Sequence, residues 1–286
     1  MRLISYFESN HTAVGVLTGD GHLVPLPFGT MNDLIAAGEA GLGLAREALT
    51  RGLKRRQEGV RLAAPIPAPH RNIFCLGWNY ADHSRESAAI RGKGEVKLPT
   101  RPIFFTKATT SVLAPEAPIP AHAGVTSQLD WEVELGVVLG LGGVDIPRDQ
   151  AMAHVFGYTI INDVSARDVQ TGHGGQFFKG KSLDGTCPMG PWLATRDEVA
   201  DPHALRLCSR VNGVTKQNAS TGQMIFDVPA IIEWLSKGMT LLPGDIIATG
   251  TPAGVGFART PPEYLRPGDV VECEVEGLGI LRNPVA

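Results

Sequence analysis

The stretch Asp130-Trp131-Glu132-Val133-Glu134-Leu135 decides how this chain is interpreted, because acidic and apolar residues alternate in it with a period of two. Successive side chains of a β-strand point to opposite faces, so the acidic residues share one face and the apolar residues the other. A half-exposed strand with a solvated acidic face is the ordinary interpretation of such a pattern. The continuation Gly136-Val137-Val138-Leu139 is apolar on both faces, and it predicts a strand that enters the protein interior.

A strand that enters the interior would bury the carboxylates of Glu132 and Glu134, which is unusual for acidic residues. A buried carboxylate without a cationic partner costs several kcal/mol, and a bound cation removes that cost. Residues two apart on a strand are separated by about 6.5 to 7 Å, so both carboxylates can reach one ion held at ~2.1 Å. We therefore predict that Glu132 and Glu134 are ligands of a divalent metal ion.

A third carboxylate ligand is expected from Asp163, which follows the β-like run Ile160-Ile161-Asn162. An aspartate at such a position is often a helix N-cap, and this interpretation stays open. Beside Glu132 and Glu134 the metal interpretation gains weight, because three carboxylates leave coordination positions for substrate and water. Ligation by oxygen alone favours Mg²⁺ or Mn²⁺ over zinc, with Ca²⁺ as a possible substitute.

The composition is that of an ordinary globular protein of 286 residues, with 43% apolar residues, 19% charged residues and a formal net charge of -3. Neither nucleic acid nor an anionic membrane is expected as a partner. No window approaches the ~20 apolar residues of a membrane span and no signal peptide is recognised, so the expected location is the cytoplasm. The four cysteines lack Cys-x-x-Cys spacing and are expected to be buried, reduced thiols.

Two domains are predicted, a small amino-terminal α+β domain over residues 1–68 and a catalytic domain over residues 69–286. In the small domain, Asp20-Gly21 lies between two β-like runs and predicts a hairpin. Strands are expected at 13–17 and 22–26, and a proline-rich linker at 63–69. A helical segment is expected at 31–53, interrupted by Gly38, Gly41 and Gly43.

The larger domain is expected to be dominated by short strands, and the predicted fold class is α+β. Its clearest helix runs from Asp227 to Lys237, with Asp227 as the N-cap and Gly238 after its end. The turn Asn212-Gly213 predicts another hairpin. Strands are expected at 73–76, 103–106, 131–139, 158–161, 205–211, 245–248 and 270–275.

His83 and Glu86 form the second candidate for chemistry. Their spacing of i, i+3 places them on one face of a helical turn, where the carboxylate orients the imidazole and stabilises its cation. Such a pair can activate water. A short surface helix with a salt bridge explains the same spacing equally well.

Two further segments suggest contacts with an anionic ligand. Lys181 follows Phe177-Phe178-Lys179-Gly180 and is better placed than Lys179 to hold an anionic oxygen, although lysines normally lie on solvated faces. The glycine-rich segment 248–256 lacks the ending of a phosphate loop, so nucleotide binding is not expected. Its backbone amides and the Thr251 hydroxyl can approach a carboxylate ligand closely.

Together these segments resemble the fumarylacetoacetate hydrolase superfamily, over roughly three quarters of the chain from about Asn72 to the carboxyl terminus. Each motif is weak alone, but the ordered set is specific. The motifs are Asn79-Tyr80-Ala81-Asp82-His83-x-x-Glu86, Asp130-Trp131-Glu132-x-Glu134, Asn162-Asp163-Val164-Ser165-Ala166-Arg167-Asp168, Gly180-Lys181-Ser182 and Thr249-Gly250-Thr251-Pro252-x-Gly254-Val255-Gly256.

The resemblance implies a β-rich mixed-sheet roll, a homodimer, and Mg²⁺ or Mn²⁺ held at the positions of Glu132, Glu134 and Asp163. It also implies that His83 and Glu86 lie on a lid and that Lys181 contacts the substrate. Residues 1–68 then resemble the small amino-terminal domain of many bacterial members.

Three further residues, Lys107, Gly250 and Thr251, are candidates for substrate binding. Phe105-Thr106-Lys107-Ala108 departs from the family pattern, since many members have Phe-x-Lys-Pro there, and the loop after Lys107 is expected to differ. The segment 85–98 is a basic lid candidate, and a solvated loop is its alternative. Its cationic residues are Arg85, Arg91, Lys93 and Lys97.

The expected activity is metal-dependent hydrolysis of a C–C bond in a 2,4-dioxo acid of the acylpyruvate or fumarylpyruvate type. His83, oriented by Glu86, would activate water, and Lys181 would stabilise the developing negative charge. The alternative is an isomerase or decarboxylase of the 2-hydroxyhepta-2,4-diene-1,7-dioate type, or an oxaloacetate decarboxylase. A non-enzymatic, metal-stabilised binding module is a remote third interpretation.

Overall fold

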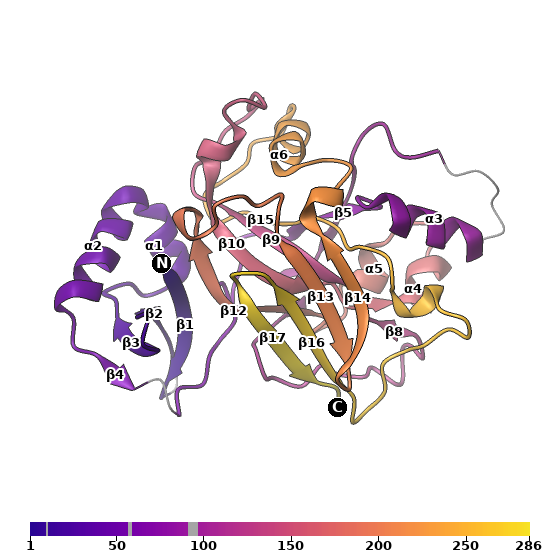
Figure 1. The fold of residues 1–286 in the computed structure, drawn as a ribbon, viewed down its shortest axis with the longest axis horizontal. Helices are drawn as coiled ribbons and strands as arrows, with labels where there is room; N and C mark the ends of the chain where they lie inside the picture. The colour runs from indigo at the N-terminus through magenta and orange to yellow at the C-terminus, as the bar shows by residue number, and fades with distance from the viewer. Residues whose placement is uncertain (10, 57–58, 91–96) are drawn as a thin grey trace.

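The computed structural model describes residues 1–286 except 10, 57–58 and 91–96 (Figure 1). In the described part of the chain, eleven strands form one mixed sheet. Ten of them follow the order β4 (Arg55–Arg56), β3 (His22–Pro25), β2 (His11–Leu17), β1 (Arg2–Glu8), β12 (Cys187–Thr195), β10 (Val155–Asn162), β9 (Val133–Leu139), β15 (Ile246–Ala248), β5 (Ile73–Gly77) and β6 (Ile103–Lys107), and β7 (Val112–Leu113) pairs with β12. Most pairs are antiparallel, whereas β15 with β5 and β12 with β7 are parallel.

A second sheet covers one face of the large sheet, and in Figure 1 its strands cross in front of β9 and β10. Apolar side chains of both sheets belong to one buried cluster, which includes Val133 and Leu135 of β9 and Val271 of β16. A two-stranded pair, β8 (Leu129–Asp130) with β11 (Ser165–Ala166), lies beside them in the fold. The second sheet has the order β14 (Val214–Ser220), β13 (Arg206–Val211), β16 (Val270–Val275) and β17 (Gly279–Pro284).

Two groups of helices lie at opposite ends of the molecule, α1 and α2 on the amino-terminal side and α3, α4 and α5 on the other, and α6 lies between them at the top of the view (Figure 1). The helical segment predicted over 31–53 forms two helices, because α1 ends at Ala36 and Gly38 adopts a positive φ of 54°, whereas the other expected interruptions, Gly41 and Gly43, lie within the second helix. The helices are α1 (Met31–Ala36), α2 (Gly38–Arg51), α3 (Ala81–Ile90), α4 (Arg167–Gly172), α5 (Phe178–Lys181) and α6 (Val228–Ser236).

The fold class predicted from the sequence is confirmed, since the chain is an α+β protein with a strand-rich mixed sheet. The predicted helix after Asp227 is confirmed as α6, and the Asp227 carboxylate accepts a hydrogen bond from the Ala230 amide at 2.9 Å. The predicted hairpins are β2 with β3 and β13 with β14. Of the lid candidate 85–98, the first residues belong to α3 and 91–96 lie outside the described residues.

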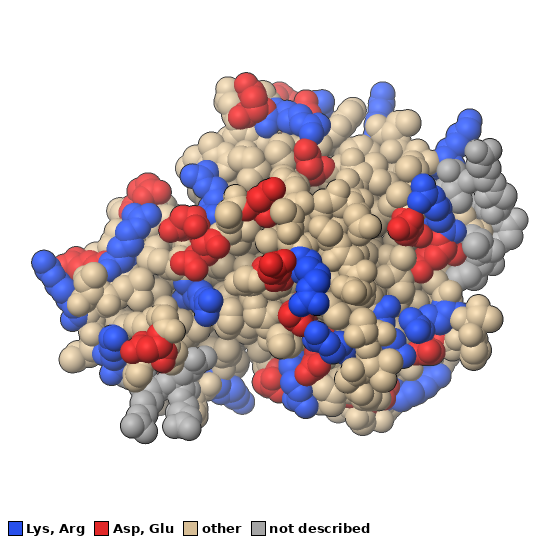
Figure 2. All heavy atoms as spheres, viewed as in Figure 1, with Lys and Arg blue, Asp and Glu red and all other residues tan. Residues whose placement is uncertain are grey.

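The surface is mixed in charge. On the face shown in Figure 2, lysine and arginine side chains lie interspersed with aspartate and glutamate side chains. Within the described ranges, none of the helices combines the length and the apolar character that a membrane crossing requires.

Candidate active site

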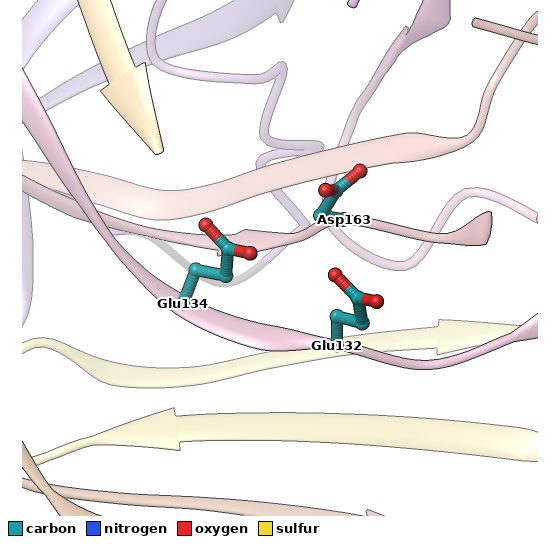
Figure 3. A group of neighbouring side chains, drawn as sticks. All are labelled: Glu132, Glu134 and Asp163. Atoms are coloured by element: carbon teal, nitrogen blue, oxygen red, sulfur yellow. The ribbon is translucent and has the colours of Figure 1, made fainter. Parts of the chain in front are cut away.

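The register of two central strands brings the three predicted metal ligands together. β10 pairs with β9 so that Asn162 lies opposite Val133, which places Asp163 beside Glu132 at the strand ends. The Asp163 amide donates to the Glu132 carbonyl oxygen at 2.9 Å. Figure 3 shows Glu132 and Glu134 projecting from one ribbon toward Asp163 on the neighbouring segment.

All three carboxylates are buried, with 4% of Glu132, 1% of Glu134 and 0% of Asp163 exposed. One oxygen from each lies within 4.8 Å of the others. Two oxygens bound to one ion at ~2.1 Å are at most about 4.2 Å apart, so a small side-chain adjustment brings all three to one cation.

Three buried cationic side chains oppose the charge of two of these carboxylates. The Lys181 ammonium lies 2.7 Å from an oxygen of Glu132 and 2.7 Å from an oxygen of Asp163. Lys107 lies 2.8 Å from the other Asp163 oxygen. Arg167 Nη2 lies 2.6 Å from the second Glu132 oxygen. Glu132 and Asp163 are thus held as buried ion pairs.

The pKa values of the two glutamates move in opposite directions. Burial raises the pKa of Glu132, but Lys181 and Arg167 outweigh it and lower that pKa to about 2. The pKa of Glu134 is raised well above its ordinary value by burial and by the negative charges of Asp163 and Glu132. Glu134 accepts a hydrogen bond from the Gly250 amide at 2.7 Å, and no ion pair to it is formed within the described residues.

These observations fit a divalent metal ion. Three carboxylates supply the hard oxygen ligands that Mg²⁺ and Mn²⁺ prefer. The raised pKa of Glu134 shows a buried carboxylate for which the protein supplies too little positive charge. Glu132, Glu134 and Asp163 would hold the ion.

A pocket of about 200 Å³ opens onto this centre. Its volume is below the 300 to 1,000 Å³ typical of sites for drug-sized ligands, so it suits a small acid. Phe105 and Phe177 form part of an apolar wall, with ring centroids 5.6 Å apart. The polar lining includes His83, Glu132, Arg167, Gln170, Lys181 and Thr251.

His83 and Glu86 form a hydrogen-bonded pair on α3. His83 Nδ1 lies 2.8 Å from Glu86 Oε1, and His83 is 6% exposed and lines the pocket. The second oxygen of Glu86 accepts a hydrogen bond from the Gly254 amide at 2.9 Å. An ionised Glu86 can only accept hydrogen bonds, so Nδ1 carries the hydrogen and Nε2 is left as a proton acceptor.

The three predicted substrate-binding residues lie at different depths. Lys107 is 0% exposed and pairs with Asp163, outside the pocket lining. The Gly250 amide holds Glu134, as described above. The Thr251 hydroxyl lines the pocket, but it donates to the Val133 carbonyl oxygen at 3.0 Å and accepts from Gln217 at 2.7 Å. Lys107 and Gly250 therefore support the carboxylates, and Thr251 forms part of the wall.

Arg167, Gln170 and Asp130 were given no separate role in the sequence analysis, although two of them lie in its motifs. Arg167 Nη1 donates to Gln170 at 3.2 Å, and both side chains line the pocket. Arg167 Nε donates to the fully buried Asp130 at 2.8 Å. The signal that could have identified Arg167 is its position four residues after Asp163, at the start of a short helix.

Comparisons with known proteins bear on the family of this chain. The family model for the carboxyl-terminal part of fumarylacetoacetate (FAA) hydrolases matches residues 72–286. Oxaloacetate tautomerase YisK of Bacillus subtilis (strain 168) is 50% identical over 226 residues, which cover 79% of this chain and 73% of that relative.

Two solved structures show the same fold over the whole chain. The fumarylacetoacetate hydrolase of Exiguobacterium antarcticum is 41% identical, with a TM-score of 0.86 and coverage of 100% of this chain and 99% of that one. A maleylpyruvate hydrolase of Sphingobium sp. SYK-6, solved with manganese(II) and pyruvate, is 29% identical with a TM-score of 0.80 and the same coverage. The chain belongs to the fumarylacetoacetate hydrolase family.

Proposed function

We propose that this protein is a divalent-metal-dependent tautomerase that interconverts the keto and enol forms of oxaloacetate or a closely related 2-oxo acid. The observation that carries this proposal is a proton-accepting His83–Glu86 pair in the same small pocket as the carboxylate centre. The bacterial relative at 50% identity bears the name of this activity. In the sequence analysis a hydrolase was favoured, and an isomerase or decarboxylase was the alternative. A tautomerase is closer to that alternative than to the hydrolase.

An ion held by Glu132, Glu134 and Asp163 would act as a Lewis acid toward the 2-oxo group of the substrate. His83 Nε2 takes the proton from C3, and Glu86 stabilises the imidazolium that forms. As the C3–H bond breaks, the C2–C3 double bond forms and electrons move to the C2 oxygen.

Lys181 serves the oxygen end of the reaction. Burial lowers the pKa of Lys181, but Asp163 and Glu132 outweigh it and raise that pKa, so the ammonium form is favoured. The ammonium donates a hydrogen bond to the C2 oxygen and stabilises its developing negative charge. Solvent then supplies the proton that completes the enol and takes the proton from His83. In the reverse reaction His83 returns a proton to C3 and the C2 hydroxyl loses its proton to solvent.

Hydrolysis of a 2,4-dioxo acid is the second candidate. The His83–Glu86 pair that removes a proton from carbon can equally remove one from water. The maleylpyruvate hydrolase with the same fold supports this candidate. The metal ion of that structure is manganese(II), which supports a divalent ion here without choosing between Mg²⁺ and Mn²⁺.

One panel of substrates tests the proposal. The protein is incubated with Mg²⁺ or Mn²⁺ and with enol oxaloacetate, acylpyruvates and hydroxymuconate-type dioates. A tautomerase accelerates the loss of the ultraviolet absorbance of enol oxaloacetate without producing pyruvate. A decarboxylase releases pyruvate and carbon dioxide, and a hydrolase cleaves only the acylpyruvates. Either of the last two outcomes would overturn the tautomerase proposal.

A further inference from the structure

One buried carboxylate of the acidic stretch takes no part in the mechanism above. Asp130 lies at the end of β8, two residues before Glu132, and 0% of it is exposed. It does not belong to the group of three carboxylates that could hold a metal ion. A buried charge this close to the site calls for a role of its own.

Both oxygens of Asp130 are fully used as hydrogen-bond acceptors. Oδ1 accepts from the amides of Trp131 at 2.8 Å and Gly256 at 2.6 Å. Oδ2 accepts from Arg167 Nε at 2.8 Å and from the Phe257 amide at 3.0 Å. Four donors on two oxygens exhaust the acceptor capacity of one carboxylate.

The groups that Asp130 holds belong to two walls of the pocket. Arg167 contacts Glu132 at 2.6 Å and lines the pocket. The Phe257 ring also lines the pocket, and its centroid lies 4.4 Å from the Arg167 guanidinium. The same loop carries Gly254, whose amide holds Glu86, and Trp131 Nε1 donates to the Gly254 carbonyl oxygen at 3.2 Å. One carboxylate therefore links the arginine to the loop that anchors the His83–Glu86 pair.

We propose that Asp130 is a positioning residue of the active site, which fixes Arg167 and the turn at Gly256 and Phe257 in one arrangement around the bound acid. This inference rests on the proposed function for its catalytic consequence. Asp130 does not touch the pocket, so it acts through Arg167 and the loop.

The charge of Asp130 is needed because no neutral side chain of the same shape can replace it. An amide in place of the carboxylate has one acceptor oxygen and one NH₂ group. Whichever way the side-chain amide of the Asp130→Asn variant turned, its NH₂ would face two N–H donors. Arg167 would then lose its fixed position and its contact with Glu132. Glu132 would still pair with Lys181 at 2.7 Å, so the three candidate metal ligands would stay in place.

The test compares Asp130→Asn with a matched control, Asp245→Asn. Asp245 is also a buried carboxylate that pairs with an arginine, Arg71, at 2.7 Å and accepts from the Leu242 amide at 2.7 Å. It precedes β15, at the opposite end of that strand from Gly250. Both variants break an ion pair between a buried aspartate and an arginine, although Arg71 is 33% exposed, and only Asp130→Asn is expected to disturb the pocket.

Asp130→Asn is expected to lower kcat/KM for enol oxaloacetate by about 100-fold, as the loss of one preorganised donor group does. Oxalate affinity, measured calorimetrically with Mn²⁺ present, should fall with it, whereas Mn²⁺ affinity should stay that of the wild type. Asp245→Asn should lower the melting temperature without changing the affinity for oxalate. Equal oxalate affinity in Asp130→Asn and the wild type would refute the positioning role.

A double-mutant cycle decides whether Asp130 acts through Arg167. In Asp130→Asn/Arg167→Gln, oxalate affinity should fall by less than the product of the two single effects, because residues that act through a shared contact are not additive. Independent, multiplying effects would overturn the proposal. If Asp130→Asn does not fold, the cycle is run with Asp130→Ser, which keeps one acceptor oxygen and leaves room for water.

The two proposals can fail separately. Oxalate and Mn²⁺ binding do not depend on turnover of oxaloacetate. If the wild type turned over no acid of the panel, the proposed function would fall, and the oxalate cycle would still decide the role of Asp130.

Discussion

At the scale of the residue, three internal cations explain how the acidic groups can be buried. Lys181, Lys107 and Arg167 contact Glu132 or Asp163 at 2.6 to 2.8 Å. Such pairs offset much of the desolvation cost that an isolated buried charge would carry. Within the part of the chain that the structure describes, Glu134 has no ion pair and accepts from a backbone amide at 2.7 Å, so of the three candidate ligands it depends most on a metal ion.

Glu134→Gln is therefore expected to weaken metal binding without lowering the stability of the metal-free protein. In the wild type, Mn²⁺ at 100 times its Kd should add about 2.7 kcal/mol to the free energy of unfolding. In Glu134→Gln this gain should be largely lost. Without metal, the variant should melt at or above the wild-type temperature, because burial disfavours the charged form of Glu134. Thermal melts with and without Mn²⁺ measure the stabilisation by metal and the stability of the metal-free protein. If Mn²⁺ raised the melting temperature of the variant as much as that of the wild type, Glu134 would not be a metal ligand.

His83→Ala is expected to lower kcat by a factor of about 10² to 10⁴, which is the usual contribution of a positioned general acid or base. The affinity for Mn²⁺ should not change, because His83 is not one of the three carboxylate ligands. His70→Ala is the matched control, since His70 is exposed and outside the pocket lining. Steady-state kinetics and metal titrations of both variants provide the measurement. Wild-type kcat in His83→Ala would remove the proton acceptor from the mechanism.

How far the site could be predicted depends on what a sequence pattern encodes. Period-two alternation encodes which face a side chain takes, and it led to Glu132 and Glu134. Alternation does not encode how deeply a residue is buried. Lys107 and Gly250, which were predicted to bind the substrate, contact Asp163 and Glu134 in the structure. The partner of Arg167 is also hidden in the sequence, because Asp130 lies on a separate short strand.

At the scale of the element, two short segments keep the catalytic side chains in place. α3 carries His83 and Glu86, and the loop after β15 holds Glu86 through the Gly254 amide at 2.9 Å. Gly254 has a φ of 103°, and a Cβ there would lie 2.2 Å from the Lys216 carbonyl oxygen. A glycine is required at 254 for both reasons.

Gly254→Ala should displace the loop and release Glu86. A displacement of about 1 Å at a catalytic group can lower activity about 100-fold, and this is the expected loss in kcat. Gly213→Ala is the control, because Gly213 also has a positive φ but no atom lies within 4 Å of its Cβ position. The control should lose stability and keep its kcat. Equal kcat values in the two variants would show that Gly254 does not position the pair.

Asp168, in the first turn of α4, links this helix to the segment 126–127. Asp168 accepts hydrogen bonds from the Thr126 hydroxyl at 2.5 Å and from the amides of Ser127 at 3.0 Å and Val169 at 2.9 Å. Burial raises the pKa of Asp168, but these hydrogen bonds outweigh it and lower that pKa below its ordinary value. A lowered folded-state pKa stabilises the protein above the unfolded-state pKa of about 3.9.

Asp168→Ala is thus expected to lower the free energy of unfolding by about 1 kcal/mol at neutral pH, as the loss of hydrogen bonds to a partly exposed side chain does. The difference from the wild type should shrink as the pH falls through the lowered folded-state pKa of Asp168, where the wild type also loses the charge. Denaturant titrations between neutral and acidic pH test this. A difference that grew at low pH would have the wrong sign for this account.

The elements were predicted where local signals are strong. Asp227 and Gly238 bounded α6 well, since capping is a local property. Of the three glycines expected to interrupt the helical segment 31–53, Gly38 separates two helices, whereas Gly41 and Gly43 lie inside α2. A glycine within a helical pattern does not by itself reveal the backbone conformation that it will adopt.

At the scale of the whole molecule, the first strands continue the large sheet. β1 pairs with β12 through Leu3 and Leu193, which are both 0% exposed. Their buried cluster also contains Ile73 and Val138 from the larger part of the chain. The boundary near residue 68 stays a prediction, and the homodimer, which sedimentation can test, stays one too. We propose that the two parts unfold together.

Leu3→Ala should therefore lower the stability of the entire chain. A cavity at a buried leucine costs about 2 to 5 kcal/mol, and we expect one calorimetric transition that moves to lower temperature as a whole. Leu53→Ala, at a side chain that is 87% exposed, should leave the transition where it is. Two separate transitions, with only the smaller one shifted by Leu3→Ala, would favour independently stable domains.

The two lysines that oppose the buried carboxylates also affect the order in which the protein folds and binds metal. Lys107 and Lys181 lie within 2.8 Å of the carboxylates that they oppose, so the polypeptide can complete its folding before any ion arrives. Unloaded copies would then persist as a reserve and acquire metal afterwards. Turnover would follow the supply of free divalent ions from moment to moment, and would not depend on the supply present during synthesis.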